Sequence, residues 1–190
     1  MKITNYNIVL GSNSPRRKEI LTQMGFKFEV RVSDKEELFS DTLKGKEVSE
    51  FLAIQKSDNL KDTLQNNELL ITADTIVVHD NQILNKPKTE NQAIKMLTSL
   101  SSSTHEVITS FCLLSTEKRE VYSETTLVTF SELSEESILY YIKKYKPFDK
   151  AGSYGIQEWI GLTSIKKIEG SYSNVVGFPT SELYKKITNF

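Results

Sequence analysis

The sequence has little cysteine, little net charge and no long apolar run, and each shortage excludes a class of protein. Among its 190 residues the single cysteine, Cys112, cannot form an internal disulfide, and its apolar neighbours predict a buried thiol in a reducing compartment. The 24 Lys and Arg residues nearly balance the 25 Asp and Glu residues, which excludes a basic surface for nucleic acid. No apolar stretch approaches the ~18 residues of a membrane span, and the N-terminal residues are too polar for a signal peptide. We therefore expect a cytoplasmic protein with no membrane or nucleic-acid partner.

Hydrophobic residues make up 38% of the chain and charged residues 26%, which is typical of a globular domain with a real core. No repeat or linker divides the sequence, so we expect a single domain over residues 1–190. Strand and helix periods alternate, and hairpin signals are mixed in, which predicts an α/β fold with a mixed, strongly twisted sheet and flanking helices. Strands are expected at 8–10, 26–32, 69–78, 83–84, 106–114, 120–130, 164–168 and 174–176, and helices after Ser14, Thr89 and Ser134, across 48–60 and at 183–187.

The first expected helix begins with an unusual concentration of positive charge. Ser14 suits an N-cap and Pro15 the first helical position, so Arg16 and Arg17, two of only four arginines, fall in the first turn. Cations there are disfavoured by a few tenths to ~1 kcal/mol each, because the helix dipole is already positive. Helix N–H groups, serine hydroxyls and guanidinium groups together favour a polyanion such as a triphosphate. A solvated basic patch is the alternative interpretation.

A second unusual position is Asp74, which interrupts an apolar strand together with Thr75. A buried carboxylate is costly unless it is paired, hydrogen-bonded or bound to a metal ion. Such a residue suits a general base, or a ligand of magnesium that bridges phosphates. The alternative is a structural aspartate that accepts hydrogen bonds from nearby backbone.

Three further segments carry weaker signals. Lys86 follows the expected hairpin and can reach the same side of the sheet as Asp74, although most loop lysines are only solvated. Glycines punctuate residues 149–157 and 170–179, which suits close approach of the backbone to a ligand or, alternatively, an ordinary connecting loop. His79 and His105 lack the spacing of metal ligands.

Taken together, these segments resemble the Maf family of nucleoside triphosphate pyrophosphatases over essentially the whole chain. The resemblance implies a bilobed fold with a central cleft, similar to inosine triphosphate pyrophosphatases. It also implies hydrolysis of a nucleoside triphosphate to the monophosphate and pyrophosphate with a divalent cation, Mg²⁺ or Mn²⁺. The motifs that carry it are Ser12–Arg17, Glu19–Leu21, Leu52-Ala53 with Lys56, Ala73–Thr75, Lys86-Pro87, His105–Val107 with Thr109, Asp149–Gln157, Gly170–Tyr172 and Val176–Pro179.

The resemblance also implies a role for individual residues. Asp74 corresponds to the proton acceptor, and with Glu37 it is the expected metal ligand, although Glu36 is an alternative to Glu37. Lys56 and Lys86 join these two carboxylates as expected catalytic residues. The remaining matched positions are expected to bind the substrate and to select its nucleobase: Ser12, Arg16, Arg17, Thr75 and Gln157.

Two late segments, 155–157 and 170–172, are similar to the branch of the family that acts on dTTP and UTP. The expected partner is thus a pyrimidine nucleoside triphosphate. The sequence leaves open whether the chain forms a homodimer. A non-catalytic regulator of septum formation and cell division, which binds a nucleotide or a protein without turnover, is the alternative function.

Overall fold

The computed structural model describes residues 4–35, 38–40 and 42–190. Within them the strands are Asn7–Leu10 (β1), Phe28–Val30 (β2), Glu68–His79 (β3), Gln82–Ile83 (β4), Thr104–Leu114 (β5), Arg119–Phe130 (β6) and Ile165–Glu169 (β7). The α-helices are Pro15–Gln23 (α1), Lys46–Asp58 (α2), Glu90–Leu100 (α3), Glu135–Tyr145 (α4), Trp159–Ser164 (α5), Tyr172–Val176 (α6) and Thr180–Thr188 (α7). Two 3-10 turns, Lys61–Thr63 (η1) and Ala151–Ser153 (η2), complete the described elements. No helix in these ranges has the length and apolar character of a membrane span.

The described strands form one mixed sheet in the order β2-β1-β3-β5-β6-β7, with β4 paired to β3. Strand β1 runs parallel to both β2 and β3, whereas β3 with β4 and β6 with β7 are antiparallel. The predicted mixed α/β sheet is therefore confirmed. The chain divides into two compact units: residues 1–74, 109–124 and 177–190 form the first, and residues 75–108 and 125–176 the second. The expected central cleft stays a prediction.

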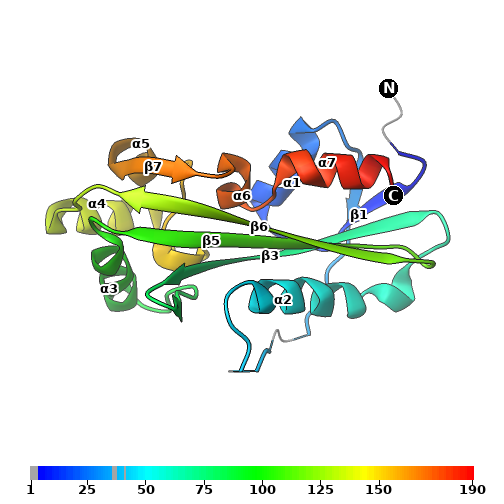
Figure 1. Cartoon of the computed structure of the whole chain (residues 1–190), viewed down its shortest axis with the longest axis horizontal. Coiled ribbons are helices and arrows are strands. Elements are labelled where there is room, and N and C mark those ends of the chain that lie inside the picture. The colour runs from blue at the N-terminus through cyan, green and yellow to red at the C-terminus, as the bar shows by residue number, and fades with distance from the viewer. Residues whose placement is uncertain (1–3, 36–37, 41) are drawn as a thin grey trace. The chain divides into compact units, whose positions relative to one another are not determined.

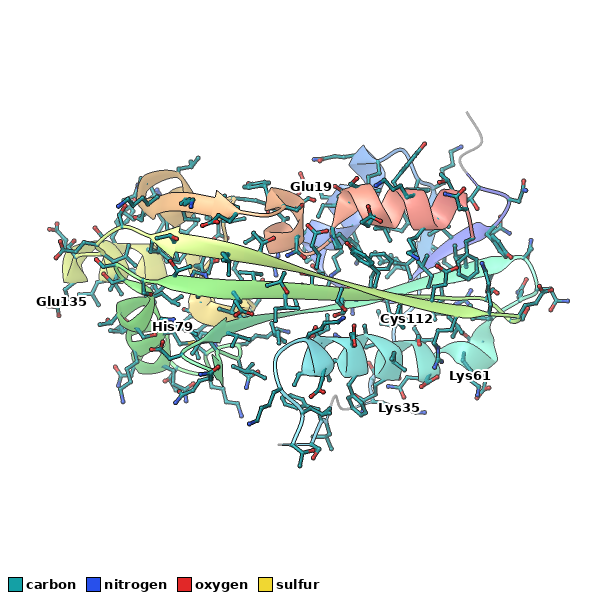
Figure 2. The ribbon with its side chains drawn as sticks, viewed as in Figure 1. Glu19, Lys35, Lys61, His79, Cys112 and Glu135 are labelled. Carbon is teal, nitrogen blue, oxygen red and sulfur yellow. The ribbon has the colours of Figure 1, made fainter. Side chains whose placement is uncertain are left out.

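In the first unit, helices cover both faces of the strands, with α7 on one side and α2 on the other (Figure 1). The helix signals of α1 are confirmed, because Pro15 opens the helix and the Ser14 side chain accepts a hydrogen bond from the Arg17 amide at 3.4 Å. Cys112 is buried on β5, where its thiol lies 3.4 Å from the Ser57 hydroxyl on α2 (Figure 2). The predicted buried free thiol is thus confirmed.

In the second unit, the hairpin predicted at Asp80-Asn81 is confirmed. Both residues have positive φ, 48° and 60°, which is the conformation that a two-residue hairpin turn requires. Strand β7 confirms the strand predicted at 164–168, and it lies along β6 (Figure 1). Valines from three strands, Val77, Val107 and Val128, form a buried cluster in this unit.

The strand expected at 174–176 is wrong, because these residues belong to helix α6. The β-branched Val175 and Val176 favour a strand, but the Ser171 side chain accepts a hydrogen bond from the Asn174 amide at 3.3 Å and closes a turn. The buried Asn174 amide group also donates to the Val107 carbonyl at 3.0 Å and to the Thr126 hydroxyl at 2.9 Å. These tertiary hydrogen bonds hold the segment as a helix against the local propensity.

A buried histidine makes the stability of the second unit sensitive to acid. His105 is 2% exposed, its Nε2 lies 2.7 Å from the Tyr154 hydroxyl, and its ring stacks on Phe130. Burial, with a smaller contribution from His79, lowers the pKa of His105 to about 3. The folded chain therefore keeps this ring neutral at pH values where the unfolded chain, with a histidine pKa near 6.5, already binds a proton.

We predict that the free energy of unfolding falls as the pH drops below about 6.5, with a loss from His105 of about 2 kcal/mol at pH 5. Replacing His105 with glutamine, which does not titrate, should flatten this dependence relative to wild type. Urea denaturation at pH 7, 6, 5 and 4 measures it. Parallel curves for the wild type and the variant would contradict the assignment.

Candidate active site

Asp74 lies in the middle of β3 and forms an ion pair with Lys56 of α2. The Lys56 Nζ donates to Asp74 Oδ1 at 2.6 Å and lies 3.4 Å from the Ala73 carbonyl oxygen. Both side chains are mostly buried, with 17% exposure for Lys56 and 14% for Asp74. The apolar strand thus carries a carboxylate that is paired with Lys56, a residue distant in sequence. This ion pair offsets the free-energy cost of burying the Asp74 charge.

The register between α2 and β3 explains why these two side chains meet. The buried Thr72 hydroxyl donates to the Ala53 carbonyl at 2.7 Å and attaches the strand to the helix. Thr72 and Asp74 are two residues apart and share one face of the strand, while Ala53 and Lys56 are three apart and share one face of the helix. One hydrogen bond therefore sets the position of the ion pair beside it.

Arg17 reaches the same stretch of β3 from α1. Its Nη1 donates to the Ala73 carbonyl at 2.9 Å and its Nε to the Gly177 carbonyl at 3.1 Å, and both hydrogen bonds are buried. The guanidinium group also lies over the Phe178 ring, 5.6 Å from its centroid. Arg17 is 9% exposed, so it joins α1, β3 and the segment before α7. Substrate binding by Arg17 stays a prediction, since these contacts are all within the protein.

The other two predicted residues near the start of α1 are Ser12 and Arg16. The Ser12 hydroxyl accepts from the Ser14 amide at 3.2 Å and from Arg17 Nη1 at 3.4 Å, so it shapes the turn before the helix. Arg16 is half-buried, in the first turn of α1. The first unit thus contains Ser12, Arg16, Arg17, Lys56 and Asp74 together.

The second unit contains Thr75, Lys86 and Gln157. Thr75 is half-buried on β3, whereas Lys86 and Gln157 are exposed, one after β4 and the other after η2. Hydrogen bonds connect the segments that carry them: the Leu84 amide donates to the Val77 carbonyl at 2.8 Å, and the Gly152 amide donates to the Leu84 carbonyl at 2.9 Å. These hydrogen bonds connect β3, the segment after β4 and η2, but they do not by themselves place the three side chains together.

Two groups near the Lys56–Asp74 pair could not be identified from the sequence, the Ala73 carbonyl and the Thr72 side chain. The Ala73 carbonyl accepts from Arg17 and faces Lys56, but a backbone acceptor has no residue-type signal. Thr72 positions α2, but a threonine in a strand is ordinary. Its close packing on Gly11, where a Cβ would come within 2.5 Å of Thr72 Cγ2, exists only in the folded chain.

A family model described as Maf-like protein matches residues 7–190. The chain belongs to this Maf-like family. A relative from Flavobacterium psychrophilum, named dTTP/UTP pyrophosphatase, is 50% identical over 188 residues, which are 99% of this chain and 96% of the relative. A relative of the same name from Flavobacterium johnsoniae is 47% identical over 187 residues, covering 98% and 96%. The solved structure of the Staphylococcus aureus Ham1 protein is 18% identical, with a TM-score of 0.45 and coverage of 65% of this chain and 71% of that one.

The divalent cation expected from the resemblance stays a prediction, because only part of its expected ligand set is described. Of the two expected metal ligands, Asp74 is described, whereas Glu37 and its alternative Glu36 lie outside the described residues. The described residues contain no group of three or more His, Cys, Asp or Glu side chains that would hold an ion alone. Magnesium with nucleotides commonly takes one or two carboxylates and completes its shell with phosphate oxygens and water, and Asp74, whose Oδ1 pairs with Lys56, would supply one such carboxylate.

We predict that Arg17→Lys lowers the free energy of unfolding by about 1–3 kcal/mol, because a lysine cannot reproduce the fork that serves the Ala73 and Gly177 carbonyls. The matched control is Arg16→Lys, next to it on the same helix and less buried, for which we expect a change within about 0.5 kcal/mol. Urea denaturation of both variants compares them. Equal losses of unfolding free energy in the two variants would contradict the role of Arg17 in connecting α1, β3 and the segment before α7.

Proposed function

We propose that this chain hydrolyses dTTP and UTP to the nucleoside monophosphate and pyrophosphate. The observation that carries the proposal is the Lys56–Asp74 ion pair, which sets a proton acceptor beside a cation in the middle of β3. The names of relatives that are 47% and 50% identical over nearly the whole chain support the same activity. We also propose a cytoplasmic location, where the nucleotide pool provides these substrates; the oligomeric state stays a prediction.

In the proposed reaction, water attacks the α-phosphorus and its proton passes to the Asp74 carboxylate. The bond between the α-phosphorus and the bridging oxygen breaks, and that oxygen leaves with the pyrophosphate. Lys56, Lys86 and Arg16 stabilise the negative charge that develops on the leaving group. Glu37 in the family pattern, together with Asp74 where that carboxylate does not serve as the base, would hold a divalent cation, which would supply positive charge for the phosphates.

Base choice is assigned to Gln157, with Arg16 and Thr75. A glutamine amide can accept a hydrogen bond from the N3–H group of thymine or uracil and donate to the adjacent carbonyl. Cytosine presents the reverse pattern, an acceptor at N3 and a donor at its exocyclic amine, so it pairs only with an amide group rotated by about 180°. Discrimination therefore requires the site to hold the Gln157 amide in one orientation. Each unpaired group costs about 1–3 kcal/mol, which is enough to discriminate between the pyrimidines.

We predict that Asp74→Asn lowers turnover at least a hundredfold while the chain stays folded, because the amide cannot accept the proton. Pyrophosphate release from a panel of nucleoside triphosphates with Mg²⁺ measures it, and circular dichroism reports the fold. The matched control is Asp80→Asn, an exposed aspartate in the hairpin turn that follows the same strand. Near-normal release by Asp74→Asn would remove this residue from the reaction. No release by the wild type from any nucleotide would favour the non-catalytic regulator.

We predict that Lys86→Ala raises the KM for the triphosphate about tenfold, by loss of one ammonium–phosphate contact. Lys86 is exposed, so the free energy of unfolding should change by less than about 0.5 kcal/mol. Lys88→Ala, an exposed lysine two residues further on, is the control. Unchanged KM and kcat for Lys86→Ala would exclude it from the site.

A further inference from the structure

Gln157 occupies the tip of a tight turn in the second unit. The Glu158 amide donates to the Gly155 carbonyl at 3.0 Å, which closes a four-residue turn with Ile156 and Gln157 in the middle. Ile156 is 6% exposed and points its side chain into the unit, whereas Gln157 is exposed. The turn therefore presents the amide group of Gln157 to solvent on an anchored backbone.

One buried hydroxyl group holds both ends of this turn. Tyr141 of α4 is fully buried, and its hydroxyl accepts a hydrogen bond from the Gly155 amide at 2.9 Å. The same hydroxyl donates to Glu158 Oε2. Burial and the adjacent Glu158 carboxylate raise the pKa of Tyr141 well above its usual range, so the hydroxyl keeps its proton as a donor. Tyr141 thus connects the first and last residues of the turn through a single oxygen atom.

A lysine holds the other oxygen of the Glu158 carboxylate. Lys150 Nζ lies 3.1 Å from Glu158 Oε1, and the Lys150 side chain is only 11% exposed. The same ammonium group pairs with Asp149 at 2.7 Å. Both oxygens of Glu158 therefore have partners from outside the turn, and the carboxylate cannot rotate without losing one of them.

Two glycines allow these groups to approach so closely. A Cβ at Gly155 would come within 2.9 Å of the Glu158 carboxyl carbon and 3.0 Å of Lys150 Cε. A Cβ at Gly161 of α5 would come within 1.9 Å of the Ile156 carbonyl oxygen, so that helix abuts the turn directly. The turn is thus confined by α4, by α5 and by the Lys150 side chain.

We infer that Tyr141 and Glu158 are positioning residues that orient the Gln157 turn and thereby set the discrimination between thymine or uracil and other bases. This inference rests on the proposed function. Paired hydrogen bonds to a base edge require donors and acceptors held within a few tenths of an ångström, and a loosened turn would lose free energy in ordering itself. The triphosphate contacts are assigned to other residues, so a loosened turn affects selectivity more than chemistry.

The test compares kcat/KM for dTTP with kcat/KM for dCTP in Tyr141→Phe, which removes one oxygen atom and retains the ring. We expect the ratio to fall about threefold to tenfold, the effect of one lost hydrogen bond, chiefly through KM for dTTP. Gln157→Ala should lower the same ratio. The double variant should show little further loss, because Tyr141 acts through Gln157.

The matched control is Tyr145→Phe, one turn later on α4, whose ring stacks on Tyr141 with centroids 5.1 Å apart. It should leave the ratio unchanged. Glu158→Gln retains the shape but loses the charge that pairs with Lys150, and it tests the inference should Tyr141→Phe fail to fold. We expect a loss of the ratio in the same direction.

The possible results distinguish a failure of the positioning role from a failure of the proposed function. An active Tyr141→Phe with lowered thermal stability and an unchanged ratio would overturn the positioning role and leave the proposed function standing. Independent, additive losses in the double variant would also overturn it. Absence of pyrophosphate release by the wild type would overturn the proposed function and this inference with it.

Discussion

A charge in the middle of a buried strand must be compensated, and much of the first unit serves that requirement. Asp74 receives the Lys56 ammonium at 2.6 Å, and the adjacent Ala73 carbonyl receives the Arg17 guanidinium at 2.9 Å. The two cations come from different helices, α2 and α1, so both helices are attached to residues 73–74 of β3, one through the carboxylate and the other through a backbone carbonyl. Removing Lys56 or Arg17 would leave a desolvated oxygen atom without that partner. The resulting loss of folding free energy exceeds the net stabilisation that the intact contact provides.

The two cations at the start of α1, Arg16 and Arg17, have different roles. Arg17 turns inward and satisfies backbone carbonyls, which offsets its unfavourable place near the positive end of the helix dipole. Arg16, beside it and less buried, keeps the role of a candidate substrate ligand. The same division occurs in the second unit, where Tyr141 is buried and Gln157 is exposed at the tip of the turn that Tyr141 holds. In each case a buried polar side chain positions the segment that carries a more accessible one.

Short-range signals predicted most of the elements. Ser14, Thr89 and Ser134 cap the helices expected after them, because a serine or threonine side chain meets the free amides of the first turn whatever lies elsewhere. The Asp80-Asn81 hairpin formed for a similarly local reason. Helix α6 was missed, since the hydrogen bonds of Asn174 to Val107 and Thr126 come from residues roughly fifty or more positions away. Of the candidate site, Asp74 stood out because its charge breaks an apolar pattern.

The sequence by itself determined the alternation of helices and strands, the caps, the buried thiol and the resemblance to the Maf-like family, because each depends on neighbouring residues or on ordered motifs. Only the tertiary structure decided that Lys56 pairs with Asp74, that Arg17 serves backbone carbonyls, and that Tyr141 holds the turn of Gln157. These contacts join segments that are 14 to 160 residues apart. The register of the elements and the burial of the side chains determine which residues form these contacts. The local pattern of residue types specifies neither the register nor the burial.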